Sequence, residues 1–137
     1  MPGTANSRPY RDTARSLSER PATRGSVLIV DSDASVCRVI ALVLQEVDCQ
    51  TYAAHSAEAA LQLADALRPA LIIAEVRLPL RSGDEFAQLL RERGHVEARI
   101  VLMSAYPRPP AGAEDHFLQK PLHFDRLLDI AREVLIA

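Results

Sequence analysis

The sequence contains no tryptophan and has only three phenylalanines and three tyrosines among its 137 residues. Because hydrophobic residues still make up 48% of the chain, the core must be built mainly from Leu, Val, Ile and Ala. No apolar run approaches the roughly 18 residues that a membrane-spanning helix requires, and the N-terminus lacks the apolar segment of a signal peptide. We therefore predict a soluble, cytoplasmic protein with no membrane partner.

Cysteine is equally scarce, since Cys37 and Cys49 are the only two. Their spacing fits neither a zinc site nor a disulfide-rich scaffold, so we expect two reduced thiols in or near the core. A chain of 137 residues is long enough for one domain with a real core and too short for two.

Charge is unevenly distributed along the chain. Residues 1–25 hold five arginines against Asp12 and Glu19, a net charge of +3, whereas the remaining eleven basic and sixteen acidic residues give −5. The first segment is rich in Ser, Thr, Pro and Arg and has no hydrophobic period, which is typical of disorder. We predict a disordered basic tail over 1–25 and a folded domain over 26–137. Scattered arginines without interleaved aromatic residues support nucleic-acid binding only weakly, and we expect none.

From Ser26 onward, short apolar runs alternate with stretches of helical periodicity. The apolar runs predict strands at 27–31, 49–54, 71–76, 99–105 and 116–119. The helical periods predict helices at 34–47, 57–68, 84–93 and 124–135. Such alternation indicates an α/β fold in which helices cover both faces of a parallel sheet.

In open sheets of this kind, ligands bind beyond the carboxyl ends of the strands. The polar residues at or just after strand ends are therefore the candidate site residues: Asp31, Ser32, Asp33, Glu75, Ser104 and Lys120. Lys120 is the only lysine in a chain that otherwise uses arginine for its basic residues. A compact ammonium charge differs from a planar guanidinium, so this single lysine indicates a specific role.

Four segments resemble the receiver domain of bacterial two-component response regulators: "VLIVDSD", "PALIIAEVRLPLRSGDEF", "IVLMSAY" and "DHFLQKPL". They occur in the order found in that family and span about residues 26–137. The resemblance implies a flavodoxin-like, doubly wound five-stranded sheet of order 2-1-3-4-5, with a cis bond between Lys120 and Pro121. It also implies that Glu75 stands at the phosphoacceptor position, and that Ser104 and Phe117 stand at the switch positions.

The family's chemistry needs a phosphoacceptor aspartate, an acidic pair for Mg²⁺, and a hydroxyl and a lysine that hold the phosphoryl oxygens. This chain retains Asp31, Ser104 and Lys120, but Ser32 replaces the second acid and Glu75 replaces the acceptor. The extra methylene of Glu75 moves its carboxylate outward by about 1.5 Å, and a displacement of about 1 Å can cost ~100-fold in rate. Mg²⁺ prefers carboxylate oxygens, so we expect its binding to be weak or lost.

The remaining acid, Asp33, stands at a variable position of the family motif, and we interpret it as the N-cap of the helix that starts at Ala34. Glu75, in contrast, is long enough to pair directly with Lys120. Two interpretations of that pair stay open. It is either a built-in partial mimic of the phosphorylated state, or an ion pair that fills an inactive site without any conformational bias.

The segment 106–115 contains Pro107, Pro109, Pro110 and Gly112. Proline inside a helix costs about 3 kcal/mol, so the helix that the family places between strands 4 and 5 should be shortened or absent. The surface that usually carries the switching output, including the neighbourhood of Phe117, therefore looks rebuilt.

We thus expect a non-enzymatic, atypical receiver in phosphorelay signalling that acts through protein contacts. Its partner would be a histidine kinase or a downstream signalling protein, and a homodimer is compatible with the sequence. One alternative is a phosphatase resembling the haloacid-dehalogenase type, in which Asp31 would be the nucleophile and Asp33 the general acid. The chain after Lys120 is too short for that fold's second acidic pair. The other alternative is a purely structural docking module.

Overall fold

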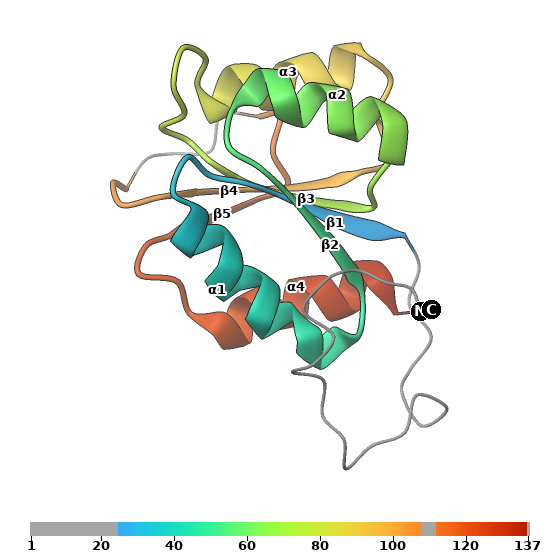
Figure 1. Ribbon diagram of the computed structural model, residues 1–137, viewed down its shortest axis with the longest axis vertical. Coiled ribbons are helices and arrows are strands. Elements are labelled where there is room, and N and C mark those ends of the chain that lie inside the picture. Colours follow the sequence, from blue (N-terminus) through green and yellow to red (C-terminus); the bar gives the residue numbers. More distant parts are fainter. Residues whose placement is uncertain (1–24, 108–111, 137) are drawn as a thin grey trace.

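A computed structural model describes residues 25–107 and 112–136 of the chain. Its strands are β1 (Ser26–Val30), β2 (Gln50–Ala54), β3 (Leu71–Glu75), β4 (Arg99–Ser104) and β5 (His116–Gln119). All neighbouring strands pair in parallel, in the order β2-β1-β3-β4-β5 (Figure 1). The predicted flavodoxin-like sheet is therefore confirmed. The predicted tail over 1–25 lies outside the described residues except for Gly25, and so stays a prediction.

The helices form one layer on each face of the sheet (Figure 1). They are α1 (Ala34–Leu44), a short 3₁₀ helix η3 (Gln45–Val47), α2 (Ala57–Leu67), α3 (Gly83–Glu92) and α4 (Phe124–Leu135). One apolar cluster joins α2 and α3 to the sheet, and a second joins α1 and α4 to its other face. No helix among the described residues is both long and apolar enough to cross a membrane.

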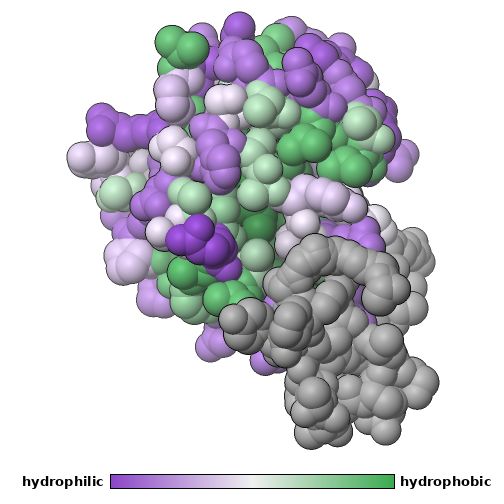
Figure 2. Space-filling model, viewed as in Figure 1, coloured by the Kyte–Doolittle hydropathy of each residue, from purple (hydrophilic) through white to green (hydrophobic). Residues whose placement is uncertain are grey.

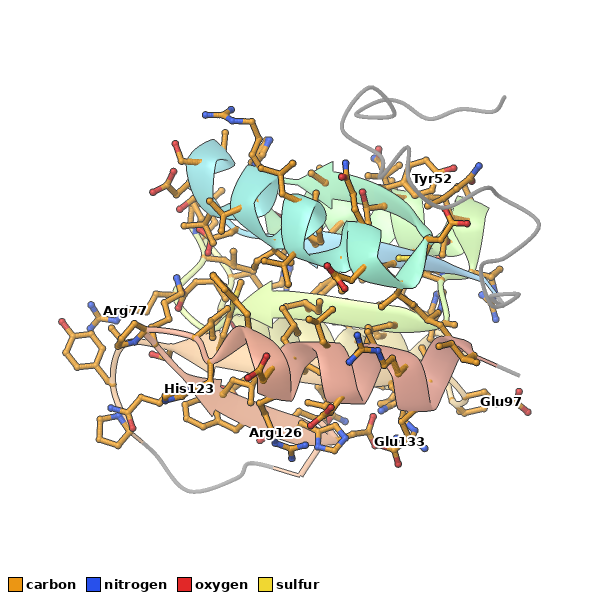
Figure 3. The ribbon with its side chains drawn as sticks, turned by 90° about the horizontal axis from the view of Figure 1, so that it is seen from below. Tyr52, Arg77, Glu97, His123, Arg126 and Glu133 are labelled. Carbon is orange, nitrogen blue, oxygen red and sulfur yellow. The ribbon has the colours of Figure 1, made fainter. Side chains whose placement is uncertain are left out.

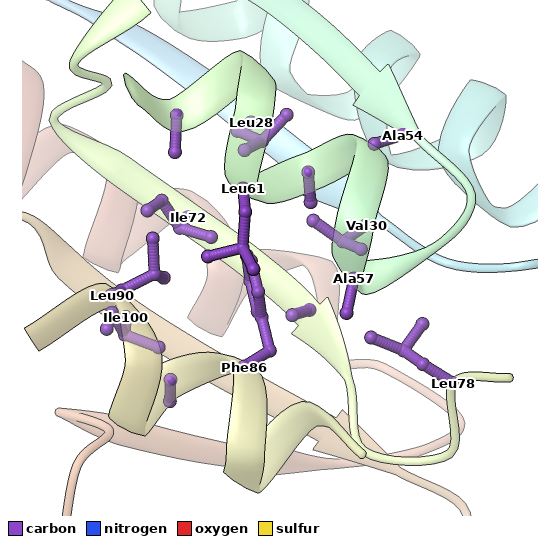
Figure 4. Packing of buried hydrophobic residues seen from close by; sticks show 14 of the residues in the cluster. Leu28, Val30, Ala54, Ala57, Leu61, Ile72, Leu78, Phe86, Leu90 and Ile100 are labelled. Carbon is purple, nitrogen blue, oxygen red and sulfur yellow. The ribbon is translucent and has the colours of Figure 1, made fainter. Parts of the chain in front are cut away.

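The core is aliphatic, as the composition requires. Every residue of β3 is buried, and so is all of β1 after its first residue, which explains their uninterrupted apolar runs. Phe86 is the largest of the fully buried side chains and packs among aliphatic neighbours under α3 (Figure 4). Both cysteines are free and buried, which confirms the prediction of reduced core thiols.

Side-chain caps fix where the helices begin. The Asp33 carboxylate accepts from the backbone N–H of Ser35 at 2.9 Å, so its predicted capping role is confirmed. Ser56 caps α2 as predicted from its position. Ser82 and Glu85 form a reciprocal capping box at the start of α3, which sequence reasoning missed.

The crossover between β4 and β5 contains no helix in its described residues, 105–107 and 112–115. This agrees with the predicted loss of helix in the proline-containing segment. Arg91 of α3 holds the end of this crossover in place of a packed helix. Its guanidinium donates to the carbonyls of His95, Ala98 and Ala113 and to the Asp115 carboxylate.

Candidate functional site

The carboxyl ends of β1, β3, β4 and β5 meet at one edge of the sheet (Figure 1). Asp31 follows β1, Glu75 ends β3 and Ser104 ends β4, and all three are buried. Lys120 follows β5, and its backbone N–H donates to the Ser104 carbonyl at 2.7 Å. Parallel pairing in register thus gathers four predicted site residues from distant parts of the sequence.

Three of these side chains are in direct contact. The Lys120 ammonium donates to Oε1 of Glu75 at 2.5 Å and to Oδ2 of Asp31 at 3.2 Å. The side chains are 25% exposed for Lys120, 9% for Glu75 and 4% for Asp31. One cation therefore lies between two carboxylates that are largely removed from water. The predicted Glu75–Lys120 pair is present, and Asp31 joins it.

The remaining oxygen of each carboxylate is held by a backbone amide. Oδ1 of Asp31 accepts from the N–H of Asp33 at 2.9 Å, and Oε2 of Glu75 accepts from the N–H of Arg77 at 3.0 Å. Each buried oxygen therefore has a hydrogen-bond donor, which is the condition under which buried charges are tolerated. All four carboxylate oxygens of Asp31 and Glu75 therefore accept a hydrogen bond from within the protein.

Two opposing effects act on the pKa of Lys120. Burial is the larger single effect and lowers it, whereas the hydrogen bonds from Lys120 to Glu75 and Asp31 raise it. The two carboxylates together prevail, and the pKa of Lys120 lies above its ordinary value. Lys120 is accordingly a charged, structurally held ammonium group at neutral pH.

The donor set fits an ammonium group better than the Mg²⁺ that the family resemblance implies. Mg²⁺ requires near-octahedral oxygen ligands and usually binds through carboxylates. Here both carboxylates already lie within hydrogen-bond distance of Lys120, and the second acid is replaced by Ser32, which is exposed. No cluster of three or more His, Cys, Asp or Glu side chains suited to a metal occurs within residues 25–107 and 112–136.

The other predicted site residues occupy the same edge but play different parts. The Ser104 hydroxyl accepts from the backbone N–H of Tyr106 at 3.2 Å. Phe117 is partly buried and packs against the core cluster on the α2–α3 face. The Lys120–Pro121 bond is cis, as the resemblance implied. Asp33 is exposed, and its carboxylate is committed to capping α1.

Sequence reasoning missed three residues that support the site. The guanidinium of Arg77 stacks over the ring of Tyr106 at 4.5 Å from its centroid, which links the loops after β3 and β4. Figure 3 shows Arg77 at the carboxyl end of the sheet, with Glu97 at the opposite end. Gly83 lies so close to β3 that an added Cβ would be 2.4 Å from the Glu75 carbonyl oxygen. Arg77 lies two residues after Glu75, the last residue of β3, and this spacing is the sequence signal that could have predicted the bond from its backbone N–H to the Glu75 carboxylate.

Comparison with known proteins gives the family. The sequence model of the response regulator receiver domain matches residues 27–132. The sensory transduction protein BceR of Bacillus subtilis is 30% identical over 109 residues, which cover 74% of this chain and 46% of BceR. BceR of Halalkalibacterium halodurans is 24% identical over 116 residues, which cover 80% of this chain and 49% of that protein. The chain thus spans about half the length of the curated relatives it matches.

Solved structures agree on the fold. The receiver domain of the Francisella response regulator 1452 superimposes with a TM-score of 0.73 at 20% identity, covering 81% of this chain and 96% of that one. The chemotaxis response regulator CheY4 of Vibrio cholerae gives a TM-score of 0.72 at 24% identity, with 82% of this chain and 99% of that chain covered.

Proposed function

Because this chain belongs to the response regulator receiver domain family, we propose that it is a receiver whose site signals without phosphoryl transfer and without Mg²⁺. Receiver domains act in two-component signalling through contacts with other proteins. The family match leaves the phosphatase alternative unsupported, and the capping role of Asp33 removes the general acid on which that alternative depended.

The single observation that carries the proposal is the position of the Lys120 ammonium between Asp31 and Glu75. A metal-dependent receiver needs its carboxylates free for the cation and its lysine free for the phosphoryl group. Here the lysine pairs directly with both carboxylates and offsets one of their two negative charges. The Glu75–Lys120 contact supplies within the chain the kind of oxygen–ammonium contact that a phosphoryl group would otherwise make.

The geometry also works against Glu75 as a nucleophile. Its Oε1 accepts from Lys120 and its Oε2 from the amide of Arg77. Attack on phosphorus would require an oxygen to leave one of these bonds in a site that is mostly closed to water. Since misplacement by about 1 Å can already cost ~100-fold, transfer to Glu75 should be negligible.

A direct test is incubation with acetyl phosphate and Mg²⁺, followed by intact-mass measurement. We expect no phosphorylated species of the native chain. The variant that combines Glu75→Asp and Ser32→Asp should bind Mg²⁺ and gain a phosphoryl group, because it restores both the acceptor length and the second acid. A stable, Mg²⁺-dependent phosphoprotein formed by the native chain would overturn the proposal.

The partner is a histidine kinase or a downstream signalling protein, and two modes of action can be separated. If the Glu75–Lys120 pair sets an active conformation, Glu75→Ala should change partner affinity. If the fold is only a docking module, the same change should leave affinity unaltered. Titration calorimetry with the partner distinguishes these modes, and Arg81→Ala, which removes an exposed ion pair with Glu58, is a matched control.

A further inference from the structure

The loop after β2 brings a histidine against a buried cysteine of α1. His55 directly follows β2, and its Nδ1 lies 3.9 Å from the Sγ of Cys37. Both atoms also approach the backbone carbonyl of Asp31, Nδ1 at 2.9 Å and Sγ at 3.6 Å. Because a carbonyl oxygen can only accept, the imidazole carries its proton on Nδ1 and the sulfur is a thiol. A sulfur, a nitrogen and an oxygen thus converge behind Asp31.

A small cavity gives access to this pair. It has a volume of about 210 Å³, lies between α1 and β2, and has Cys37, Arg38 and His55 in its lining. Cys37 is only 3% exposed, whereas His55 is exposed, so the imidazole lies nearer to solvent than the thiol. Figure 2 shows the face on which α1 and β2 point toward the viewer, with pale and apolar surface between charged residues. A small ion can therefore reach the thiol alongside the imidazole.

The separation of the two side-chain atoms is one that a single metal ion can bridge. Zinc binds sulfur at about 2.3 Å and imidazole nitrogen at about 2.0 Å. One such ion spans about 4.3 Å between sulfur and nitrogen when the two ligands lie opposite each other, and about 3.5 Å at a tetrahedral angle. The 3.9 Å between Sγ and Nδ1 falls between these limits. The backbone therefore already holds both ligand atoms at a suitable distance.

The ligand types and the local charge favour a soft monovalent cation. Thiolate sulfur selects Cu⁺ or Zn²⁺, and imidazole binds both metals. Zinc sites are usually four-coordinate, but the described residues contain no group of three or more His, Cys, Asp or Glu side chains suited to a metal. The described lining of the cavity also includes no carboxylate, and Arg38 adds a positive charge. One thiolate neutralises a monovalent ion but leaves a divalent ion with excess charge beside Arg38.

We propose that Cys37 and His55 form a binding site for one soft monovalent cation of the Cu⁺ class. On binding, a metal–sulfur bond replaces the S–H bond of Cys37, and the thiol proton passes to solvent. Nδ1 of His55 becomes the second ligand, and its proton moves to Nε2 on the exposed side of the ring. No atom changes oxidation state.

The thiol is unreactive until a metal arrives. Burial, with the charge of Asp31 as a second cause, raises the pKa of Cys37 to about 11. The free thiolate is the nucleophile that oxidants attack, and at neutral pH almost none is present. Metal binding is therefore the chemistry that this cysteine and its imidazole neighbour favour.

The proposed site adjoins the ion cluster through Asp31. The backbone carbonyl of Asp31 faces Cys37 and His55, while its side chain accepts from Lys120. Metal binding takes both donors away from that carbonyl, so the amide resonances around Asp31 should shift when Cu⁺ is added. Lys120 is not a ligand of the proposed ion, so Cu⁺ binding does not depend on whether the receiver signals without phosphoryl transfer.

The first test is titration of the native chain with Cu⁺ without oxygen, in competition with a colorimetric Cu⁺ chelator. We expect one equivalent to bind per chain and Cys37→Ser to abolish binding. His55→Ala should weaken binding at least as much as the ~10–100-fold that loss of a residue orienting a metal ligand costs. Cys49→Ser and His123→Ala are matched controls, because Cys49 is also a buried free thiol and His123 is also an exposed histidine.

The controls decide between this site and nonspecific thiol binding. Cys49→Ser and His123→Ala should keep the native affinity. If His55→Ala also keeps it, the thiol alone holds the ion and the proposal is wrong. Thermal denaturation of the metal-free variants identifies any that are unfolded, and the next test needs no substitution.

Spectroscopy of the native chain gives that second test. X-ray absorption at the copper edge of the Cu⁺-loaded protein should show one sulfur neighbour and one imidazole nitrogen. Two sulfur neighbours, or no imidazole, would overturn the proposal. An excess of Zn²⁺ should not displace Cu⁺, since the site offers too few ligands for zinc. Displacement by Zn²⁺ would contradict the assignment to a monovalent cation.

Discussion

The two ends of the sheet each carry an ion cluster, and the two clusters differ in burial. At the carboxyl end, Lys120 joins two carboxylates whose side chains are 4% and 9% exposed. At the amino end, Asp65 of α2 pairs with Arg93 and with His95, and the Asp65 and Arg93 side chains are 39% and 44% exposed. Similar pairing chemistry thus serves two purposes. The carboxyl-end cluster supplies a counter-charge to carboxylates that are buried in the fold. The amino-end cluster connects elements at the protein surface.

The amino-end cluster nonetheless has one buried member. The His95 side chain is only 2% exposed and lies 2.9 Å from Asp65 through its Nε2. Arg91 meanwhile donates to the His95 carbonyl at 2.7 Å. These contacts fix the loop between α3 and β4. This end of the molecule positions the strands, and the other end carries the candidate chemistry.

The largest expected effect is that of removing the cation at the carboxyl end. Lys120→Met leaves two buried carboxylates without a counter-charge, and breaking a buried ion pair by removing one partner costs about 3–5 kcal/mol. Urea denaturation should show this loss of unfolding free energy. Arg93→Met removes a cation at the amino end and should have a much smaller effect. If Lys120→Met and Arg93→Met lost the same unfolding free energy, the proposed difference between the two clusters would be wrong.

The same lysine predicts a pH dependence. Because the folded pKa of Lys120 is raised above its ordinary value, its contribution to stability is full below that ordinary value and disappears as pH rises through the folded pKa. The native chain should therefore lose stability above about pH 10.4, the ordinary lysine pKa. The Lys120→Met variant should lack this component of the alkaline transition.

Backbone packing beneath Glu75 should give the next largest effect. In Gly83→Ala, the new Cβ would lie 2.4 Å from the Glu75 carbonyl oxygen and 2.9 Å from the Val76 Cα. Overpacking of this kind costs about 1–3 kcal/mol. At the amino end, a Cβ added at Gly94 would meet no atom within 4 Å, but the φ of this residue is +94°. Any loss of unfolding free energy in Gly94→Ala therefore arises from the backbone conformation alone. If Gly83→Ala and Gly94→Ala lost the same unfolding free energy and shifted the amide resonances near Glu75 equally, this account would be contradicted.

The smallest expected effect is at the exposed cluster. The Arg93 and His95 partners lower the pKa of Asp65 to about 2. A lowered pKa stabilises the fold above the ordinary value, and that stability is lost as pH falls towards 2. Solvent screening limits it to about 0.2–1 kcal/mol. Asp65→Asn should therefore differ from the native chain at pH 6, and in denaturation curves the difference should disappear only below pH 2, where the folded carboxyl is protonated. A difference that is independent of pH would show that the charge of Asp65 is not responsible.

The sequence predicted the features that depend on hydrophobic period and strand ends. Continuous apolar runs located β1 and β3, and their polar ends located Asp31 and Glu75. The helix expected over 34–47 instead changes to 3₁₀ geometry after Leu44, because Asp48 turns the chain with a φ of +59°. Helix ends depend on such caps, which periodicity does not reveal.

Contacts between distant loops could not be predicted in this way. The stacking of Arg77 on Tyr106 depends on where the folded chain places the loops after β3 and β4. This contact leaves no periodic signal in the sequence. The pairing of Lys120 with Glu75 was foreseen because family resemblance fixed the neighbouring strands. The further contact with Asp31 emerged only from the side-chain geometry.

The central claim is that the Lys120 ammonium takes the place of a divalent cation between Asp31 and Glu75. Titration calorimetry of the native chain with Mg²⁺ tests it most directly. The account predicts no binding heat up to about 10 mM Mg²⁺, because hard-cation binding needs carboxylates that the lysine already occupies. Saturable one-to-one binding well below that concentration would contradict it.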